Sequence, residues 1–343
     1  MNLDLSAEQM AVRELYADLF ANESTPERIR AAEPLGYDPA LWAQLIGTGA
    51  LGIAVPEGLG GAGAGLLELV LLAEEAGRRL ASIPIAEVLA SVRLLAEFEA
   101  RDLLEESMSG AKLVSLATGT ASLADQTLAD GAVADYVIAL DGERLVVLAR
   151  PAVVRHLPNA GSLPMARWHD ATEVTELAVG SRARQSFDVA CDEVRILRSA
   201  LLVGLSFEAI EIGAAYARER RAFGLPIGGY QAVAHPLADA IVATDGAQLL
   251  TWKACWAAAS RHATAPSLAS MAFIFAGQTA FFAAQHSLHI HGGYGFMAEY
   301  DIQLYFRRSK AWQTIFADPQ LELHGLADRR FGPVLADTAG DVS

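Results

Sequence analysis

The chain has 343 residues, of which 52% are apolar and 20% are charged. These proportions are those of a folded globular protein, and they exclude a disordered chain, a collagen-like repeat and a disulfide scaffold. The 41 acidic and 26 basic residues give a formal net charge of −15. A surface this negative repels phosphate backbones, so we expect no nucleic-acid partner. The length allows two or three domains.

Two cysteines, Cys191 and Cys255, are too few for a disulfide framework, which favours a reduced, cytoplasmic location. The opening residues MNLDLS contain no basic stretch followed by an apolar one, so a signal peptide is not expected. The longest apolar run, residues 271–284, is interrupted at Gly277 and is shorter than the ~20 residues that span a bilayer. We therefore expect a buried helix there and no membrane partner.

Residues 1–110 have the pattern of a helical N-terminal domain. Ser6 followed by Gln9 is a capping box, and apolar residues recur after it at near-helical spacing. A glycine-rich loop at residues 58–65 precedes an apolar helix at residues 66–80. The loop lacks the Gly-Lys-Ser/Thr of a phosphate-binding loop and follows no strand. We interpret it as a turn between helices.

Residues 111–190 change character and predict a small middle β-domain. Apolar, β-branched segments lie on both sides of Asp141 and Gly142, which is a strong hairpin signal. Short strands with turn signals are expected to continue as far as Phe187 and Val189. The prediction is therefore a mainly α chain that is interrupted by one β-domain.

Residues 191–335 return to helical patterning and predict a C-terminal domain. Three long segments, at residues 196–221, 231–263 and 266–291, are followed by a shorter one at residues 301–315. Long antiparallel helices of this kind form a four-helix bundle. The last dozen residues show no clear pattern.

Two helix ends in this bundle carry candidate binding residues. Residues 218–224, RERRAFG, place basic side chains where they complement the helix dipole, but charges followed by an aromatic ring would also clamp a pyrophosphate and stack on a purine. Residues 289–296, HIHGGYGF, contain paired glycines that allow close backbone approach to a flat or anionic ligand. His289 and His291 fall about 200° apart on a helix, so we expect no metal site.

Taken in order, these motifs resemble the acyl-CoA dehydrogenases, flavoenzymes that introduce a double bond between the α and β carbons of an acyl-CoA thioester. The resemblance is carried by LDLSAEQ at the start, by LW, PE, GG and EE within residues 41–75, by ER, FG and PI within residues 219–227, and by GGYG and EY within residues 292–300. It implies an α-domain, a β-barrel-like middle domain and a C-terminal four-helix bundle. It also implies bound FAD, an acyl-CoA substrate and an oligomer.

The resemblance implies that six bundle residues hold the pyrophosphate and adenosine end of FAD: Arg220, Phe223, Gln231, His289, Gly292 and Gly293. In the family the arginine holds the pyrophosphate of the neighbouring subunit's FAD, and the phenylalanine and glutamine line the same site. The two glycines receive the adenosine end. His289 stands where the family usually has glutamine, and it can still donate a hydrogen bond.

The positions of the catalytic base depart from the family pattern. The reaction needs a carboxylate that removes the α-proton, and the family carries its glutamate at one of two positions, which are Phe316 and Val194 here. The nearest carboxylates are those of Asp318, two residues late, and Glu193. Arg195 matches an arginine that often follows the second position, which implies a contact with substrate.

The middle domain also departs, because the family's Gly-Ser-Asp stretch around the flavin ring and thioester is missing, and residues 116–120 are the nearest segment. We therefore expect the FAD-clamping subunit of a bacterial heteromeric acyl-CoA dehydrogenase of fatty acid or sterol catabolism. A homologous partner in a heterotetramer would supply the glutamate and the ring pocket, and a flavoprotein would accept the electrons. The alternatives are a self-sufficient homo-oligomer with Asp318 or Glu193 as base, a flavin oxidase, and a helical scaffold without flavin.

Overall fold

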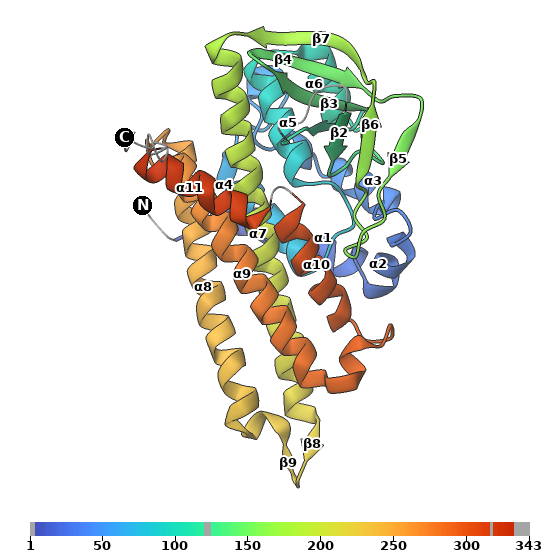
Figure 1. The fold of residues 1–343 in the computed structure, drawn as a ribbon, viewed down its shortest axis with the longest axis vertical. Coiled ribbons are helices and arrows are strands. Elements are labelled where there is room, and N and C mark those ends of the chain that lie inside the picture. The colour runs from blue at the N-terminus through green and yellow to red at the C-terminus, as the bar shows by residue number, and fades with distance from the viewer. Residues whose placement is uncertain (1–3, 120–124, 316–317, 333–343) are drawn as a thin grey trace, which may run out of the picture.

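The computed structural model describes residues 4–119, 125–315 and 318–332. Helices come first, two small sheets follow, and a helical bundle completes the described chain (Figure 1). This order, mainly α with small sheets in the middle, confirms the fold class that the sequence predicts.

The N-terminal region is helical, and its elements are α1 (Ala7–Glu23), α2 (Pro26–Ala32), α3 (Pro39–Gly47), η1 (Ala50–Gly52), η2 (Glu57–Leu59), α4 (Leu66–Arg78), α5 (Ala86–Glu97) and α6 (Arg101–Met108). The predicted capping box begins α1, where the Ser6 hydroxyl accepts a hydrogen bond from the Gln9 N–H and the Gln9 side chain accepts one from the Ser6 N–H. The glycine-rich loop is the predicted turn between helices. A Cβ on Gly61 would lie 2.2 Å from the Val55 carbonyl oxygen, so the packing of the loop itself requires a glycine.

The middle region contains the strands β1 (Val114–Leu116), β2 (Asp125–Leu128), β3 (Tyr136–Asp141), β4 (Arg144–Ala149), β5 (Val154–His156), β6 (Ala166–His169) and β7 (Thr172–Val179). One sheet has the order β1-β3-β4-β7 and the other has the order β2-β6-β5. Strands β3 and β4 pair antiparallel, and Gly142 turns between them with a φ of 61°. The hairpin predicted at Asp141 and Gly142 is confirmed.

The longest helix, α7 (Ser181–Glu219), begins earlier than the sequence predicts. The expectation that strands continue to Phe187 and Val189 is wrong, because both residues lie in the first turns of α7. Ala183, Phe187 and Ala190 are buried, and their spacing of four and three residues is that of one helix face. A short segment with β-branched and aromatic residues does not distinguish strand from helix by pattern alone, so packing decides.

The bundle consists of α7, α8 (Gln231–Ala259), α9 (Ala265–His291) and α10 (Ile302–Thr314), with β8 (Arg221–Ala222), β9 (Leu225–Pro226), η3 (Ile227–Gly229) and η4 (Gly292–Phe296) at the ends of its helices. A further helix, α11 (Pro319–Phe331), lies across α7 and α9 (Figure 1). Helix α11 is not among the predicted elements, although Asp318 before Pro319 is a typical helix start. Helix α7 and the span Ala265–Phe296, which joins α9 and η4, are long and apolar enough to cross a membrane, but 61% and 67% of their most apolar windows are buried in the fold.

Helix α7 connects the regions because it packs against α4, α5, α8 and α9. Glycines permit its closest crossing. A Cβ on Gly204 would lie 1.8 Å from the Glu74 carbonyl oxygen, and one on Gly77 would lie 2.0 Å from the Leu201 carbonyl oxygen. Helix α7 therefore packs against α4 and α5 toward one end of the molecule and extends to the β8–β9 hairpin at the other end (Figure 1).

Candidate functional site

The β8–β9 hairpin holds an aromatic side chain in solvent. Its turn residues, Phe223 and Gly224, have φ values of 51° and 84°, as a two-residue type I′ turn requires. A left-handed conformation costs a residue with a Cβ about 1–2 kcal/mol. The side chain of Phe223 is 97% exposed, so burial of its ring does not offset this cost. The packing of the chain itself does not explain this residue, which points to a contact outside the chain.

Arg220 lies beside this turn with a fixed backbone and an available side chain. Its N–H donates to the Tyr216 carbonyl oxygen at 2.9 Å, and its own carbonyl oxygen accepts from the Ile227 N–H at 2.8 Å. Within the described ranges, no ion pair or side-chain hydrogen bond engages its exposed guanidinium. Gln231 is the exposed first residue of α8, which begins without a side-chain cap. A cation and a helix N-terminus thus lie within one short segment.

The candidate residues of α9 lie at the same end of the bundle. The ring of Tyr216 in α7 stacks on that of His291, with centroids 4.1 Å apart, which joins the ends of the two helices. Gly292 has a φ of 59°, and a Cβ on Gly292 or Gly293 would meet nothing within 4 Å. Both glycines are exposed, as is His289. Backbone at this helix end is therefore open to close approach from outside.

His291 is a packing residue. Its Nδ1 donates to the Ser287 carbonyl oxygen at 2.7 Å, and burial lowers the pKa of its imidazole. Among the described residues, no group of three or more His, Cys, Asp and Glu side chains is placed to hold a metal ion.

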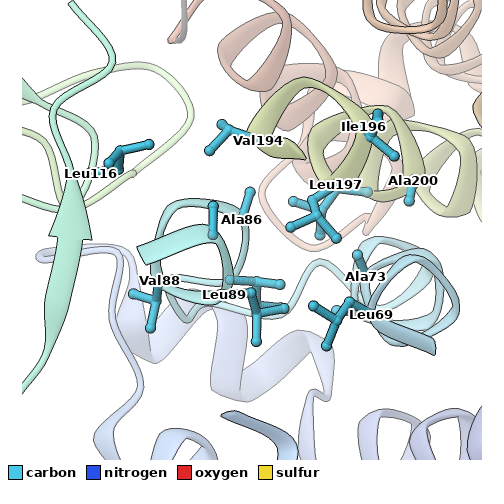
Figure 2. Packing of buried hydrophobic residues seen from close by; sticks show 14 of the residues in the cluster. Leu69, Ala73, Ala86, Val88, Leu89, Leu116, Val194, Ile196, Leu197 and Ala200 are labelled. Carbon is cyan, nitrogen blue, oxygen red and sulfur yellow. The ribbon is translucent and has the colours of Figure 1, made fainter. Parts of the chain in front are cut away.

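Of the two base positions, Phe316 lies outside the described residues. Val194 is fully buried and belongs to the same hydrophobic cluster as Leu116 of β1 and Ala86 of α5 (Figure 2). Leu116 is the first residue of the segment nearest to the family's ring-binding stretch. Its side chain is also buried in apolar packing.

Glu193, the carboxylate next to Val194, forms a two-bond ion pair with Arg93 of α5, and both distances are 2.9 Å. The pairing raises the pKa of Arg93 although its burial opposes this. No local sequence signal predicts this pair, because its members are one hundred residues apart. Glu193 is therefore already neutralised by a residue of the same chain.

A small cavity lies beside this packed region. It has a volume of about 30 Å³, and its lining includes Glu87, Arg198, Arg308 and Ile315, the last of which directly precedes Phe316. Ligand pockets measure ~300–1,000 Å³. This cavity has room for a water molecule and not for an acyl thioester.

Buried charges surround this cavity. Arg198 donates to Glu87, and both side chains are almost fully buried. Asp130 accepts a hydrogen bond from the Ser115 hydroxyl at 2.9 Å, and burial, with the Glu87 charge nearby, raises its pKa to about 7. Burial also lowers the pKa of Arg308 to about 10, while its guanidinium donates to Ser82. Arg198 and Glu87 thus satisfy each other, whereas Asp130 and Arg308 are bonded to neutral groups of the chain.

Two further candidates help to hold α11. Arg195, expected to contact substrate, is buried and donates to Glu322 of α11 at 2.9 and 3.0 Å and to Asp192 at 3.0 Å. Asp318, the alternative base, is the exposed N-cap of α11 and accepts from the Gln320 N–H at 2.8 Å. The capping carboxylate satisfies an otherwise unpaired helix donor. The structure thus gives both residues a packing role, and their predicted roles in the reaction stay predictions.

Comparison with known proteins agrees with the motifs. The acyl-CoA dehydrogenase C-terminal domain model matches residues 163–316, and the N-terminal domain model matches residues 6–98. "Acyl-CoA dehydrogenase IpdE2" of Mycolicibacterium smegmatis is 29% identical over 327 residues, which cover 94% of this chain and 98% of that protein.

Solved structures of this fold are similar over almost the whole chain. The ChsE4-ChsE5 complex from Mycobacterium tuberculosis has a TM-score of 0.85 at 24% identity, covering 96% of this chain and 99% of that one. The Tcur3481-Tcur3483 steroid ACAD G363A variant has a TM-score of 0.83 at 27% identity, covering 94% and 97%. The chain belongs to the acyl-CoA dehydrogenase family of flavoprotein oxidoreductases.

Proposed function

We propose that this chain is the FAD-clamping subunit of a hetero-oligomeric acyl-CoA dehydrogenase, and that a homologous partner supplies the catalytic glutamate and the flavin-ring pocket. The observation that carries the proposal is Val194. This residue occupies one of the family's two base positions, is fully buried, and cannot accept a proton. General-base catalysis contributes roughly 10²–10⁴-fold to such reactions.

The packing around Val194 supports the same division of labour. The small cavity lined by Glu87 and Arg198 has a volume of about 30 Å³ and no space for the acyl group and thioester of a substrate. The Glu193 carboxylate is held by Arg93, and moving it toward a substrate would leave a partly buried guanidinium without its counter-charge. The chain therefore contributes to catalysis through binding and assembly.

The residues at the bundle end fit the distal half of FAD. Arg220 would hold the pyrophosphate, because a guanidinium fork makes two charge-assisted hydrogen bonds to a diphosphate. Gly292 and Gly293 leave room for the adenosine end, since a Cβ there would meet nothing of the chain. FAD, when bound, supplies the two-electron acceptor for the hydride from the β-carbon. The residues of this chain bind and orient the cofactor.

A partner subunit would cover the apolar side chains at this end of the bundle. Five large apolar residues are exposed on β8–β9 and on and next to η4: Phe223, Leu225, Tyr294, Phe296 and Met297. Exposed apolar groups that cluster in this way are typical of subunit interfaces. The names of two similar structures, the ChsE4-ChsE5 complex and the Tcur3481-Tcur3483 steroid ACAD, support a two-component enzyme and a sterol-derived acyl-CoA. A cytoplasmic flavoprotein would then accept the electrons.

The flavin content of the assembled complex tests this function. The chain would be purified with a longer, glutamate-bearing homologue, and FAD per protein would be measured by absorbance after denaturation. Arg220→Ala should lower FAD occupancy clearly. Arg218→Ala is the matched control, because Arg218 is an exposed arginine on the same helix end and pairs with Glu211. Unchanged occupancy in Arg220→Ala would contradict the proposal.

A further inference from the structure

A second cavity, of about 980 Å³, lies between the C-terminal half of α5, the first turns of α7 and the α8–α9 turn. Its volume is that of a site for a small molecule. It shares no lining residue with the small cavity at Glu87 and Arg198, and its own wall includes Glu193, next to Val194. The α8–α9 turn and the β8–β9 hairpin lie at opposite ends of the bundle, so this cavity is separate from the FAD clamp (Figure 1).

The carboxylates in its wall already have partners. Glu193 pairs with Arg93, and Asp192 pairs with Arg195. Glu97 accepts a hydrogen bond from the Ser186 hydroxyl at 2.6 Å. Asp192 and Glu193 are therefore neutralised by arginines, whereas the exposed Glu97 has a neutral hydroxyl as its hydrogen-bond partner.

Two arginines also lie in the wall of the cavity. Arg182 and Arg261 both line the cavity, and neither forms an ion pair with a carboxylate in the described part of the chain. Arg182 lies over the ring of Phe98, with the guanidinium carbon 5.1 Å from the centroid. In a chain of net charge −15, two unneutralised guanidinium groups at one cavity form a local anion site.

The backbone of Arg261 is a second, independent observation. Arg261 follows the end of α8 with a φ of 51°, and the next residue, His262, donates its N–H back to the Ala257 carbonyl oxygen at 2.8 Å. This is the helix-ending motif in which glycine is preferred at the left-handed position. An arginine there costs free energy relative to glycine, so the turn does not explain the side chain. The position of the Arg261 side chain in the wall of the cavity gives a reason for an arginine at this turn.

The rest of the wall is largely apolar, and its members include Ala54, Ala90, Ala96, Ala190, Val189 and Ala258. Small apolar side chains of this kind contact a hydrocarbon and offer a polar ligand few hydrogen bonds. The wall therefore combines a hydrocarbon-binding surface with two cations.

We propose that this cavity binds an apolar carboxylate, whose charge is held by Arg182 and Arg261 and whose hydrocarbon part contacts the alanine-rich wall. A planar guanidinium matches a carboxylate in geometry as well as in charge. The binding site rests on the described cavity alone and does not depend on the proposed role in flavin binding.

Calorimetric titration of the purified full chain with decanoate tests the site. Decanoate should bind saturably and more weakly at high salt, because salt screens the charge contact. Arg182→Gln and Arg261→Gln should each raise the Kd about tenfold, which corresponds to about 1.4 kcal/mol. Arg184→Gln is the matched control. Arg184 is exposed on the same turn of α7, donates to the Gly142 carbonyl oxygen and does not line the cavity, so this variant should bind as the wild type does.

A second variant separates binding from folding. Arg261→Gly removes the guanidinium and supplies the residue that the turn prefers, so the melting temperature should hold or rise while decanoate binding weakens. Decyltrimethylammonium, which has a chain of the same length and the opposite charge, should not bind. The proposal is overturned by equal binding of this cation, by unchanged decanoate affinity in Arg182→Gln and Arg261→Gly, or by an equal loss in Arg184→Gln.

Discussion

The buried region between α5 and α7 and the exposed end of the bundle use similar residue types in opposite ways. In the buried region the chain satisfies its own groups, since Val194 is enclosed by apolar side chains and Arg198 pairs with Glu87. At the bundle end, Arg220 has no ion-pair partner in the described residues and Phe223 is held in solvent at a backbone cost. The chain's own apolar side chains therefore enclose Val194, whereas Arg220 and Phe223 are available to another molecule.

The largest expected effect comes from breaking the buried pair. Arg198→Met should lower the free energy of unfolding by about 3–5 kcal/mol, because it leaves the Glu87 carboxylate buried without its counter-charge. Arg218→Met is the control at the bundle end, where Arg218 and Glu211 are both mostly exposed, and it should cost less than about 1 kcal/mol. Urea unfolding of both variants measures the difference. Equal losses would show that the two regions do not differ as described.

The pH dependence of stability tests whether the buried region holds a neutral carboxyl at Asp130. Burial raises the pKa of this carboxyl from 3.8 to about 7, so the folded protein holds its proton more tightly than the unfolded chain does. The stabilisation is complete below about pH 4 and is lost as the pH rises through 7. Relative to Asp130→Asn, the wild type should therefore lose stability between pH 4 and pH 8, by at most about 1.4 kcal/mol per pH unit. Parallel stability curves for the two proteins would argue against a buried neutral carboxyl.

The smallest effect on stability is expected at the hairpin. Phe223→Gly removes a Cβ from a left-handed residue, so the lone chain should gain about 1 kcal/mol in unfolding free energy. The same variant should associate less tightly with the partner, because it removes an exposed ring from the surface proposed to be covered. Thermal melts of the lone chain and sedimentation of the mixture report the two effects. A loss of stability in the lone chain would place Phe223 in the fold's own packing.

The sequence predicts the order of the regions because local patterns, such as the Ser6 capping box and the Gly142 hairpin, indicate each of them. The predictions from sequence fail where contacts between residues distant in the chain determine the structure. The start of α7 depends on the burial of Phe187, and Arg195 is engaged by Glu322, 127 residues later. The cavity at Arg261 likewise comes from three elements that lie far apart in the sequence.

Turnover by the lone chain tests the division of the site most directly. The purified chain, supplied with FAD, would be assayed with straight, branched and sterol-derived acyl-CoAs and an artificial electron acceptor. Its rate should lie at least about 10²-fold below that of the chain mixed with a glutamate-bearing homologue, because the lone chain has valine at Val194, which cannot accept a proton. Robust turnover by the lone chain that Asp318→Asn abolishes would contradict this and show that the chain carries its own base.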